Sequence, residues 1–245
     1  MKTQPKTIVI TGASSGIGLA LAGAYLQRGD NVVGNARSAE RLQQASVSLG
    51  SPDNFLGVAG DVADPVVGDL LVRRAIERFG HVDVLVNNAG FFNAKPFIQY
   101  TPDELEALVS TNLKGFVYPS QAAVRHMVER KAGHIISITA SLASQPNQAV
   151  PAVLPLLIKG GINQATKALA LELAPHNIQV TAVAPGIVDT PMYTKEMHGF
   201  LNTLQPAGRI GTVQEIVDAV LYLSDASFTT GIVLPVDGGM GTGKW

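Results

Sequence analysis

The sequence predicts one doubly wound α/β domain: a parallel seven-stranded sheet with helices on both faces. Short β-branched runs alternate with longer segments of helical spacing along all 245 residues. The strand runs are almost continuously apolar, as a sheet covered on both faces requires. No linker, repeat or low-complexity segment interrupts the alternation. This favours a single domain over residues 1–245.

Each predicted strand is a short apolar run, and each predicted helix has apolar residues at intervals of three and four. The helix over 38–49 has the weakest periodicity. The predicted strands are 7–11, 31–35, 55–60, 82–88, 134–139, 178–184 and 231–237. The predicted helices are 16–29, 38–49, 64–80, 102–130, 156–175 and 212–223.

Residues 186–211 form the longest segment without clear periodicity. A loop of this length inside a compact domain usually has a function. Its apolar, adaptable side chains suit a substrate lid, and the alternative is a surface excursion that folds back on itself. The side chains in question are Met192, Tyr193, Met197, His198, Phe200 and Leu201.

The composition restricts the classes of partner. The chain is 46% hydrophobic and 15% charged, with a formal net charge of −1. Because this charge gives no broad basic field, the sequence argues against binding to nucleic acid or an anionic membrane surface. Few charges beside many apolar residues also indicate a surface buried between subunits.

Several chemistries and locations are excluded or disfavoured by what the sequence lacks. It has no cysteine, which excludes disulfides, thiolate metal sites and cysteine nucleophiles. The five histidines have no ligand spacing, so no metal site is predicted. The N-terminal segment lacks the features of a signal peptide, and no run approaches the roughly 18 apolar residues of a membrane span. We therefore expect a cytoplasmic protein.

A glycine-rich loop, TGASSGIG at 11–18, joins the first predicted strand to the first helix. Its glycines permit a tight turn and let backbone N–H groups approach a pyrophosphate at a helix N-terminus. Its place in a β-α-β unit supports a dinucleotide site and hence a Rossmann fold. The expected cofactor-binding residues here are Gly12, Ser14, Ser15, Gly16, Ile17 and Gly18.

The end of the second strand, GNARS, favours NADP(H) over NAD(H). Sites selective for NAD usually have an acid here for the ribose 2′-hydroxyl, but this chain has Arg37 and Ser38. A guanidinium can hold a 2′-phosphate by paired charge-assisted hydrogen bonds, which a carboxylate would repel. The alternative is that Arg37 is a solvated charge. Asp61, with Val62 beside it, is placed after the third strand to contact the adenine.

Several motifs in the same order resemble the short-chain dehydrogenase/reductase family over essentially the whole chain. TGASSGIG resembles the family's TGxxxGxG, NNAG at 87–90 closes the fourth strand, and PGIVDT at 185–190 resembles the segment that holds the nicotinamide. ISITAS at 136–141 resembles the catalytic-serine strand end, and VDGG at 236–239 follows the last strand. The resemblance implies further cofactor contacts at Asn88, Ala89, Gly90, Pro185, Gly186, Val188 and Thr190.

The resemblance also implies catalytic roles for Asn112, Ser141 and Lys159. Lys159 lies where the lysine of the family's YxxxK motif belongs and would also hold the nicotinamide ribose. Ser141 would bind the substrate oxygen, with Thr139 as the alternative. The residue four positions before Lys159 is Pro155, and no tyrosine occurs between 119 and 192. The motif phenol is therefore absent, although proline is tolerated near a helix start.

Loss of the phenol requires another proton donor. Hydride delivery to a carbonyl builds an alkoxide, and a positioned general acid is worth about 10²–10⁴-fold in rate. In the favoured route, the proton is relayed along a chain formed by Ser141, the ribose, Lys159 and a water held near Asn112. A positive nicotinamide ring nearby would favour the neutral amine. Tyr193 or His198 of the lid is the alternative donor.

The predicted substrate pocket is apolar and aromatic and suits a hydrophobic ketone or aldehyde. Its residues follow the NNAG motif, lie in the loop before the helix of Lys159, or belong to the lid. Core packing is the alternative for each aromatic residue. The candidates are Phe92, Phe97, Leu142, Val153, Tyr193, Met197 and Phe200.

Two functions are consistent with these features. The first is an NADPH-dependent carbonyl reductase or alcohol dehydrogenase with an atypical active site, favoured by the retained Asn112, Ser141 and Lys159. The second is a catalytically weak or inactive NADP-binding sensor or partner subunit, favoured by the missing phenol. The family resemblance implies a homotetramer that packs through the helices at 102–130 and 156–175.

Overall fold

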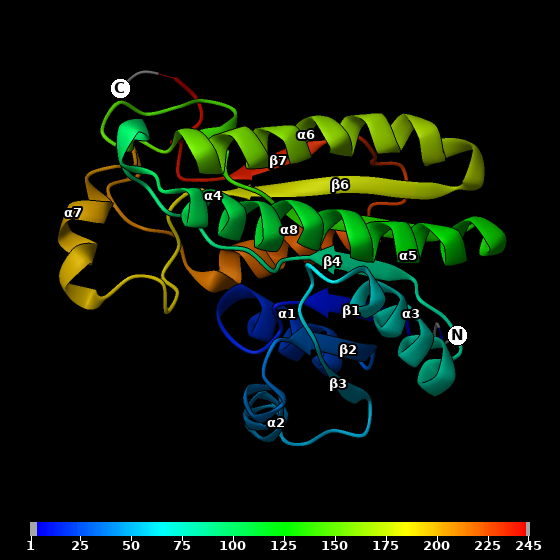
Figure 1. The fold of residues 1–245 in the computed structure, drawn as a ribbon. Coiled ribbons are helices and arrows are strands. Elements are labelled where there is room, and N and C mark those ends of the chain that lie inside the picture. The colour runs from blue at the N-terminus through cyan, green and yellow to red at the C-terminus, as the bar shows by residue number, and fades with distance from the viewer. Residues whose placement is uncertain (1–3, 244–245) are drawn as a thin grey trace.

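The computed structural model describes residues 4–243 and confirms the predicted doubly wound sheet (Figure 1). All seven strands are parallel and lie in the order β3-β2-β1-β4-β5-β6-β7. The strands are β1 (Thr7–Thr11), β2 (Asn31–Ala36), β3 (Phe55–Ala59), β4 (Val84–Asn87), β5 (Gly133–Ile138), β6 (Ile178–Pro185) and β7 (Val233–Val236).

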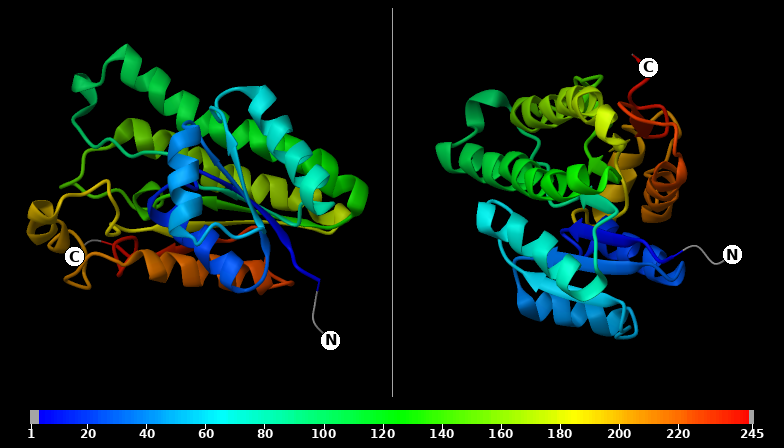
Figure 2. Two further views of the ribbon diagram at one scale, coloured as in Figure 1. Left: turned by 90° about the horizontal axis from the view of Figure 1, so that it is seen from below. Right: turned by 90° about the vertical axis from the view of Figure 1, so that its right-hand side faces the viewer.

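Helices cover both faces of the sheet, as the right-hand view of Figure 2 shows. Side chains of a strand alternate between the two faces: Ile8 and Ile10 pack with α1 and α8, whereas Val9 packs with α3, α5 and α6. The helices are α1 (Gly16–Gln27), α2 (Ala39–Ser48), α3 (Pro65–Phe79), α4 (Pro102–Leu108), α5 (Gly115–Arg130), α6 (Val153–Leu173), α7 (His198–Asn202) and α8 (Val213–Asp225).

Three predicted elements differ in detail. The segment 102–130 is not one helix, because a π-helix over Val109–Lys114 separates α4 from α5. Such π-turns occur frequently at functional sites. The helix that carries Lys159 begins at Val153 rather than at 156. The segment 186–211 is not wholly irregular, since it contains a 3₁₀-helix over Lys195–Met197 and the short α7.

The topology creates a crevice at the carboxyl ends of β1 and β4. The chain passes from β1 outward to β2 and β3, then returns to β4 on the other side of β1. Loops after β1 and β4 therefore leave the sheet in opposite directions, which opens a binding crevice in doubly wound folds. The loops approach closely at its base, where a Cβ on Gly12 would lie 3.0 Å from Ala89 Cα.

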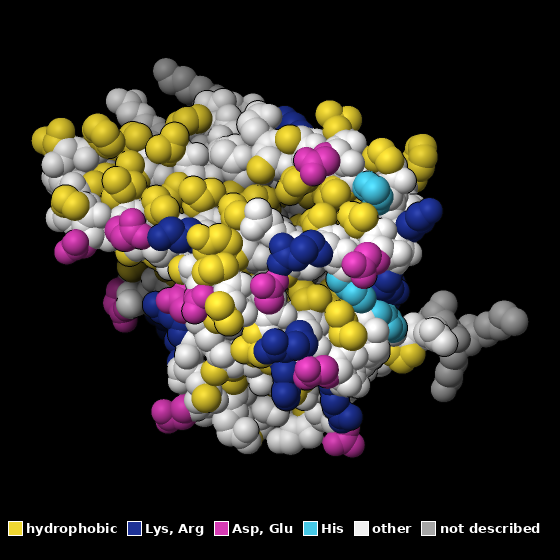
Figure 3. Space-filling model, turned by 45° about the vertical axis from the view of Figure 1, so that its right-hand side comes forward, with side chains coloured by type: hydrophobic (Ala, Val, Ile, Leu, Met, Phe, Trp, Pro, Cys, Tyr) yellow, Lys and Arg dark blue, Asp and Glu magenta, His cyan; other side chains and the backbone are white. Residues whose placement is uncertain are grey.

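The surface is apolar over the helices on one face. Hydrophobic side chains gather in the upper half of Figure 3, where α5 and α6 lie. Leu157 and Leu171 on α6 are 68% and 80% exposed. Within residues 4–243, no helix is long and apolar enough to cross a membrane.

Candidate active site

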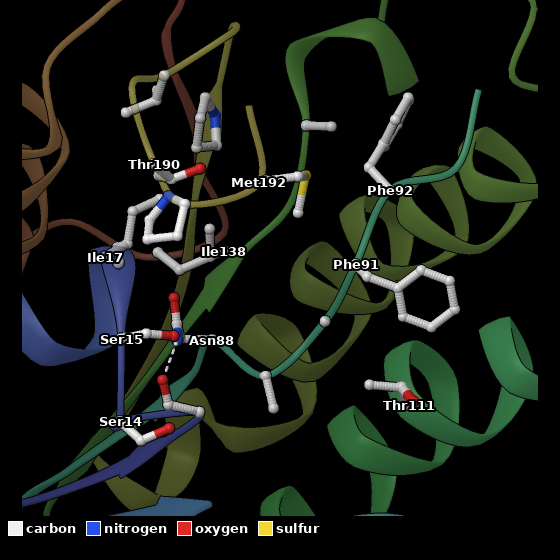
Figure 4. A pocket seen from close by; sticks show the side chains of 18 of the residues that line it. Ser14, Ser15, Ile17, Asn88, Phe91, Phe92, Thr111, Ile138, Thr190 and Met192 are labelled. Atoms are coloured by element: carbon white, nitrogen blue, oxygen red, sulfur yellow. Dashed lines mark hydrogen bonds between the residues drawn. The ribbon is translucent and has the colours of Figure 1, made fainter. Parts of the chain in front are cut away.

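A cavity of about 590 Å³ lies at the carboxyl ends of the strands. Figure 4 shows Ser14, Ser15 and Ile17 on one wall and Phe91 and Phe92 on the opposite wall. The cavity extends to side chains after β2 and to the segment after β6. It therefore joins the predicted cofactor loop to the predicted substrate pocket.

The glycine loop has the backbone geometry that its glycines allow. Gly12 and Gly16 have φ values of +69° and +53°, which favour glycine. Gly18 does not line the cavity but packs beneath it, where a Cβ would clash with Gly12 O. The Ser15 side chain does not cap α1, so the first N–H groups of the helix are available to an anion. The loop thus fits a pyrophosphate.

The other predicted cofactor residues line the same cavity. Asn88 is fixed by its side-chain amide, which donates to Thr11 O at 2.9 Å and Gly12 O at 3.2 Å. These bonds join the carboxyl ends of β1 and β4. The lining includes Arg37, Ser38, Asp61, Val62, Asn88, Ala89, Gly90, Lys159, Pro185, Gly186, Val188 and Thr190.

A second guanidinium, that of Arg41, also lines this end of the cavity. Its Nη2 donates to Ser15 Oγ at 3.3 Å, and Ser38 Oγ accepts from the Arg41 backbone N–H at 3.2 Å. Sequence reasoning missed Arg41. Arg41 could have been identified from its position four residues after Arg37. It lies in the first turn of α2, which begins at the carboxyl end of β2, beside the cavity.

Lys159 is buried at the centre of the site, with only 8% of its surface exposed. It projects from α6, and its Nζ donates to Ile138 O, at the end of β5, at 2.8 Å. Burial lowers the pKa of Lys159 from 10.5 to about 8. A substantial fraction of the side chain can therefore be neutral at mildly alkaline pH.

Pro155 occupies the first turn of α6, where its missing N–H removes no intrahelical bond. The residue is buried and does not line the cavity. The position four residues before Lys159 therefore offers no polar group to the site.

Asn112 lies behind the cavity wall rather than in it. In the π-helix, its Oδ1 accepts from Phe91 N at 3.1 Å and its Nδ2 donates to Phe91 O at 3.1 Å. A Cβ on Gly90 would clash with Asn112 Oδ1 and lie 3.3 Å from Lys159 Nζ. Glycine at position 90 therefore lets both polar groups approach the same point. The neighbouring Thr111, which sequence reasoning missed, lines the cavity directly.

Ser141, which the sequence predicts to bind the substrate oxygen, lies outside the cavity. Its Oγ is buried without a hydrogen-bond partner and does not line the cavity. The reason is that Ser141 begins a 3₁₀-helix and its Cβ faces the C-terminal segment near Gly241. Thr139 does line the cavity, and its Oγ1 donates only a long bond of 3.3 Å to Val183 O. The alternative hydroxyl, Thr139, is therefore the one that shares the cavity with Lys159.

The apolar end of the cavity contains some of the predicted pocket residues. Phe92, Leu142 and Tyr193 line it. The others do not, because their side chains point largely to solvent. They are Phe97, Val153, Met197 and Phe200, which are 43–61% exposed.

Two methionines complete this end of the cavity. Met192 projects into the space between Thr190 and Phe92 (Figure 4). Met240 comes from the segment after β7, lines the cavity and is only 2% exposed. Sequence reasoning did not assign Met240, because the glycine-rich segment around it has no periodicity. Tyr193 and His198 are the two residues of the segment 186–211 that the sequence offers as alternative proton donors. Tyr193 lines the cavity, whereas the His198 side chain lies 3.4 Å from Asp189 and does not.

Within the described residues, 4–243, no group of three or more metal-ligating side chains is present.

Comparison with known proteins supports the assignment of the fold. The short chain dehydrogenase family matches residues 6–199. The 3-oxoacyl-(acyl-carrier-protein) reductase of Salmonella typhimurium is 35% identical over 250 residues, covering 98% of this chain and 99% of the relative.

Two solved structures share the architecture. The 3-ketoacyl-(acyl-carrier-protein) reductase of Brucella melitensis complexed with NADH has a TM-score of 0.90 and 31% identity, covering 96% of this chain and 98% of that one. ElxO with NADP bound has a TM-score of 0.91 and 27% identity, covering 98% of this chain and 100% of that one. The chain therefore belongs to the short-chain dehydrogenase family and is an oxidoreductase that acts on CH–OH and C=O groups.

Proposed function

We propose that the chain is an NADPH-dependent reductase of a hydrophobic ketone or aldehyde that works without the motif tyrosine. The observation that carries this proposal is one continuous cavity, which joins the glycine loop, the buried Lys159 and an apolar pocket. The curated relative that reduces a 3-oxoacyl group supports carbonyl chemistry. The two solved structures with NADH and NADP support a nicotinamide cofactor.

The cofactor would supply the hydride, and the preference for NADPH rests on charge. Arg37 and Arg41 both line the end of the cavity after β2. Two guanidinium groups there complement a 2′-phosphate, and among the described residues that line the cavity only Asp61 is acidic. Binding of NADPH and NADH to wild-type protein and Arg37→Asp tests this. We expect tighter NADPH binding in the wild type and a shift towards NADH in the variant. Equal shifts for both cofactors would contradict the preference.

Proton delivery is assigned to a route through Lys159. Its amine lies in the cavity wall, and its pKa of about 8 lets it hold or release a proton near neutral pH. Thr139 replaces Ser141 as the hydroxyl that orients the substrate oxygen, because of these two residues only Thr139 lines the cavity. Asn112 fixes the backbone at Phe91 beside this point. Water would then resupply the proton to Lys159.

Tyr193 is the second candidate donor. Its side chain lines the cavity from the lid, and burial raises the pKa of its phenol. The raised pKa favours the protonated phenol that a general acid needs. The variants Lys159→Met and Tyr193→Phe distinguish the routes, because only the variant that removes the donor abolishes turnover while NADPH still binds.

The substrate end of the cavity favours a neutral, hydrophobic carbonyl compound. Phe92, Leu142, Met192, Tyr193 and Met240 line it. None of these five described residues carries a charge, so they offer no ionic partner to a carboxylate or phosphate, and burial of such a group without a charged partner is unfavourable. We also propose that part of the segment 186–211 acts as a lid over this end, within a chain that forms a single domain.

A non-catalytic NADP-binding role is the second candidate function. It is favoured by Pro155, which offers no polar group, and by Ser141, whose hydroxyl is outside the cavity. The variant Pro155→Tyr tests between the two. In a reductase that works without the phenol, the added group raises turnover by up to about 10²–10⁴-fold. Absence of turnover in both proteins, with NADPH bound, would favour the binding role.

We propose that the protein assembles as a homotetramer through α5 and α6. The apolar surface over these helices in Figure 3 supports the packing, and so do Leu157 and Leu171, which are exposed on α6. Light scattering at micromolar concentration is expected to give the mass of four chains. A monomer would remove the claim.

A further inference from the structure

Gln205 is a buried polar residue that the proposed chemistry does not use. It lies just after α7, inside the segment 186–211 that contains the proposed lid, and only 3% of its surface is exposed. Its side-chain Oε1 accepts from Ile187 N at 3.2 Å, and its Nε2 donates to Ile187 O at 3.2 Å and to Arg209 O at 2.8 Å. One amide thus bonds to both backbone groups of Ile187.

The segment that Gln205 holds forms part of the cavity wall. Pro185, Gly186, Ile187 and Val188 all line the cavity. Gly186 packs closely against both Gln205 and Asp237, since a Cβ on Gly186 would clash with Gln205 Oε1 and lie 2.9 Å from Asp237 Cα. The wall therefore packs directly on the Gln205 amide and on the residue after β7.

Backbone bonds also hold the middle of this wall without replacing Gln205. Gly186 N donates to Val236 O at 3.0 Å, and Gly211 N donates to Ile187 O at 2.8 Å. The buried N–H of Ile187 has a different partner, Gln205 Oε1. Removing the amide would leave this donor unpaired in a buried site, which is unfavourable.

We infer that Gln205 is a positioning residue: its amide holds the Pro185–Val188 wall in the conformation that binds the cofactor. The inference rests on the proposed function in assigning that wall to the nicotinamide.

The bonds of Gln205 also limit which part of the proposed lid can move. Movement of residue 205 would break all three bonds, so the segment that opens lies within 190–204 and Gln205 is its fixed end.

The test uses Gln205→Met, which keeps the length of the side chain and removes the amide. Two quantities are measured: the dissociation constant for NADPH, and hydrogen exchange of the backbone amides at 186–189 in the protein without cofactor. We expect the dissociation constant to rise about tenfold and exchange at Ile187 to accelerate. An unchanged affinity with unchanged exchange would overturn the inference.

The matched control is Val217→Ala, a substitution in the fully buried face of α8 that does not touch the cavity. It lowers global stability but is expected to leave NADPH affinity within twofold. If it weakens NADPH as much as Gln205→Met does, the effect of Gln205 is general destabilisation and the inference fails. If wild-type protein binds no NADPH, the proposed function fails, while exchange at Ile187 still tests the role of Gln205.

Gln205→Glu provides a second variant should the methionine variant not fold. A protonated carboxyl can accept from Ile187 N and donate to Ile187 O as the amide does, whereas a carboxylate can only accept. Burial raises the pKa of such a carboxyl. We expect NADP⁺ affinity to be low at alkaline pH and to recover as the pH falls, relative to the wild type. A pH profile parallel to that of the wild type would contradict the positioning role.

Discussion

The buried amine of Lys159 makes a quantitative prediction about stability. Burial lowers its pKa from 10.5 to about 8, and a difference of this size corresponds to about 3 kcal/mol of folding free energy at pH 7. Between pH 8 and 10.5 the unfolded chain binds more protons than the folded chain, so stability rises with pH in this window. The penalty is therefore fully present below pH 8 and is relieved as the pH approaches 10.5.

Lys159→Met removes the amine and retains most of the side-chain volume. It also leaves Ile138 O without the donor that lies 2.8 Å away, which costs about 1–3 kcal/mol. These opposing effects nearly cancel at pH 7, so the sign of the stability change there is not informative. The pH dependence is informative, because only the lysine titrates. We expect the stability of the variant relative to wild type to fall by about 2–3 kcal/mol between pH 7 and pH 10.

Urea unfolding followed by circular dichroism at both pH values measures this difference. The matched control is Lys167→Met, on the exposed side of the same helix. Its stability relative to wild type is expected to change little between the two pH values. If Lys159→Met shows the same relative stability at pH 7 and pH 10, the buried amine does not carry a depressed pKa, and the proton route loses its physical basis.

Three further variants and one glycine control test the rest of the site. Gly90→Ala places a methyl group against Asn112 Oδ1 and is expected to reduce turnover at least tenfold. The control is Gly161→Ala, where a Cβ meets nothing within 4 Å, and its stability in urea unfolding should be unchanged or higher by about 1 kcal/mol. Arg41→Ala is expected to weaken NADPH about tenfold and NADH less than twofold in titrations, and equal effects would contradict a contact with the 2′-phosphate. Met240→Ala enlarges the apolar end of the cavity and should lower KM for bulkier ketones relative to smaller ones in steady-state assays.

The fold was predictable because its signals are local and repeated. The apolar strands, the helical spacing between them and the glycine loop each fix one element, and a parallel sheet then brings the loops together at one edge. The positions of Gly12 and Lys159 at the cavity could be predicted in this way, since each residue belongs to a short motif in a defined structural context. The same is true of Arg37, which directly follows β2 at the cavity edge.

The parts that were not predictable depend on small shifts or on contacts distant in sequence. Whether Thr139 or Ser141 faces the cavity depends on where β5 ends and the 3₁₀-helix begins, a matter of one or two residues. Met240 reaches the cavity only because the segment after β7 folds back and packs Met240 with Leu201 and Leu204. Gln205 has no motif, and its role appears only when its partners at Ile187 are known.

The most direct test of the central claim is NADPH oxidation by the purified protein across a panel of aliphatic and aryl ketones, with Lys159→Met measured alongside and NADPH binding determined separately. We predict turnover by the wild type that disappears in the variant, while the variant still binds NADPH. No turnover on any ketone, with tight NADPH binding by both proteins, would contradict the claim that this site reduces carbonyl groups without the motif phenol.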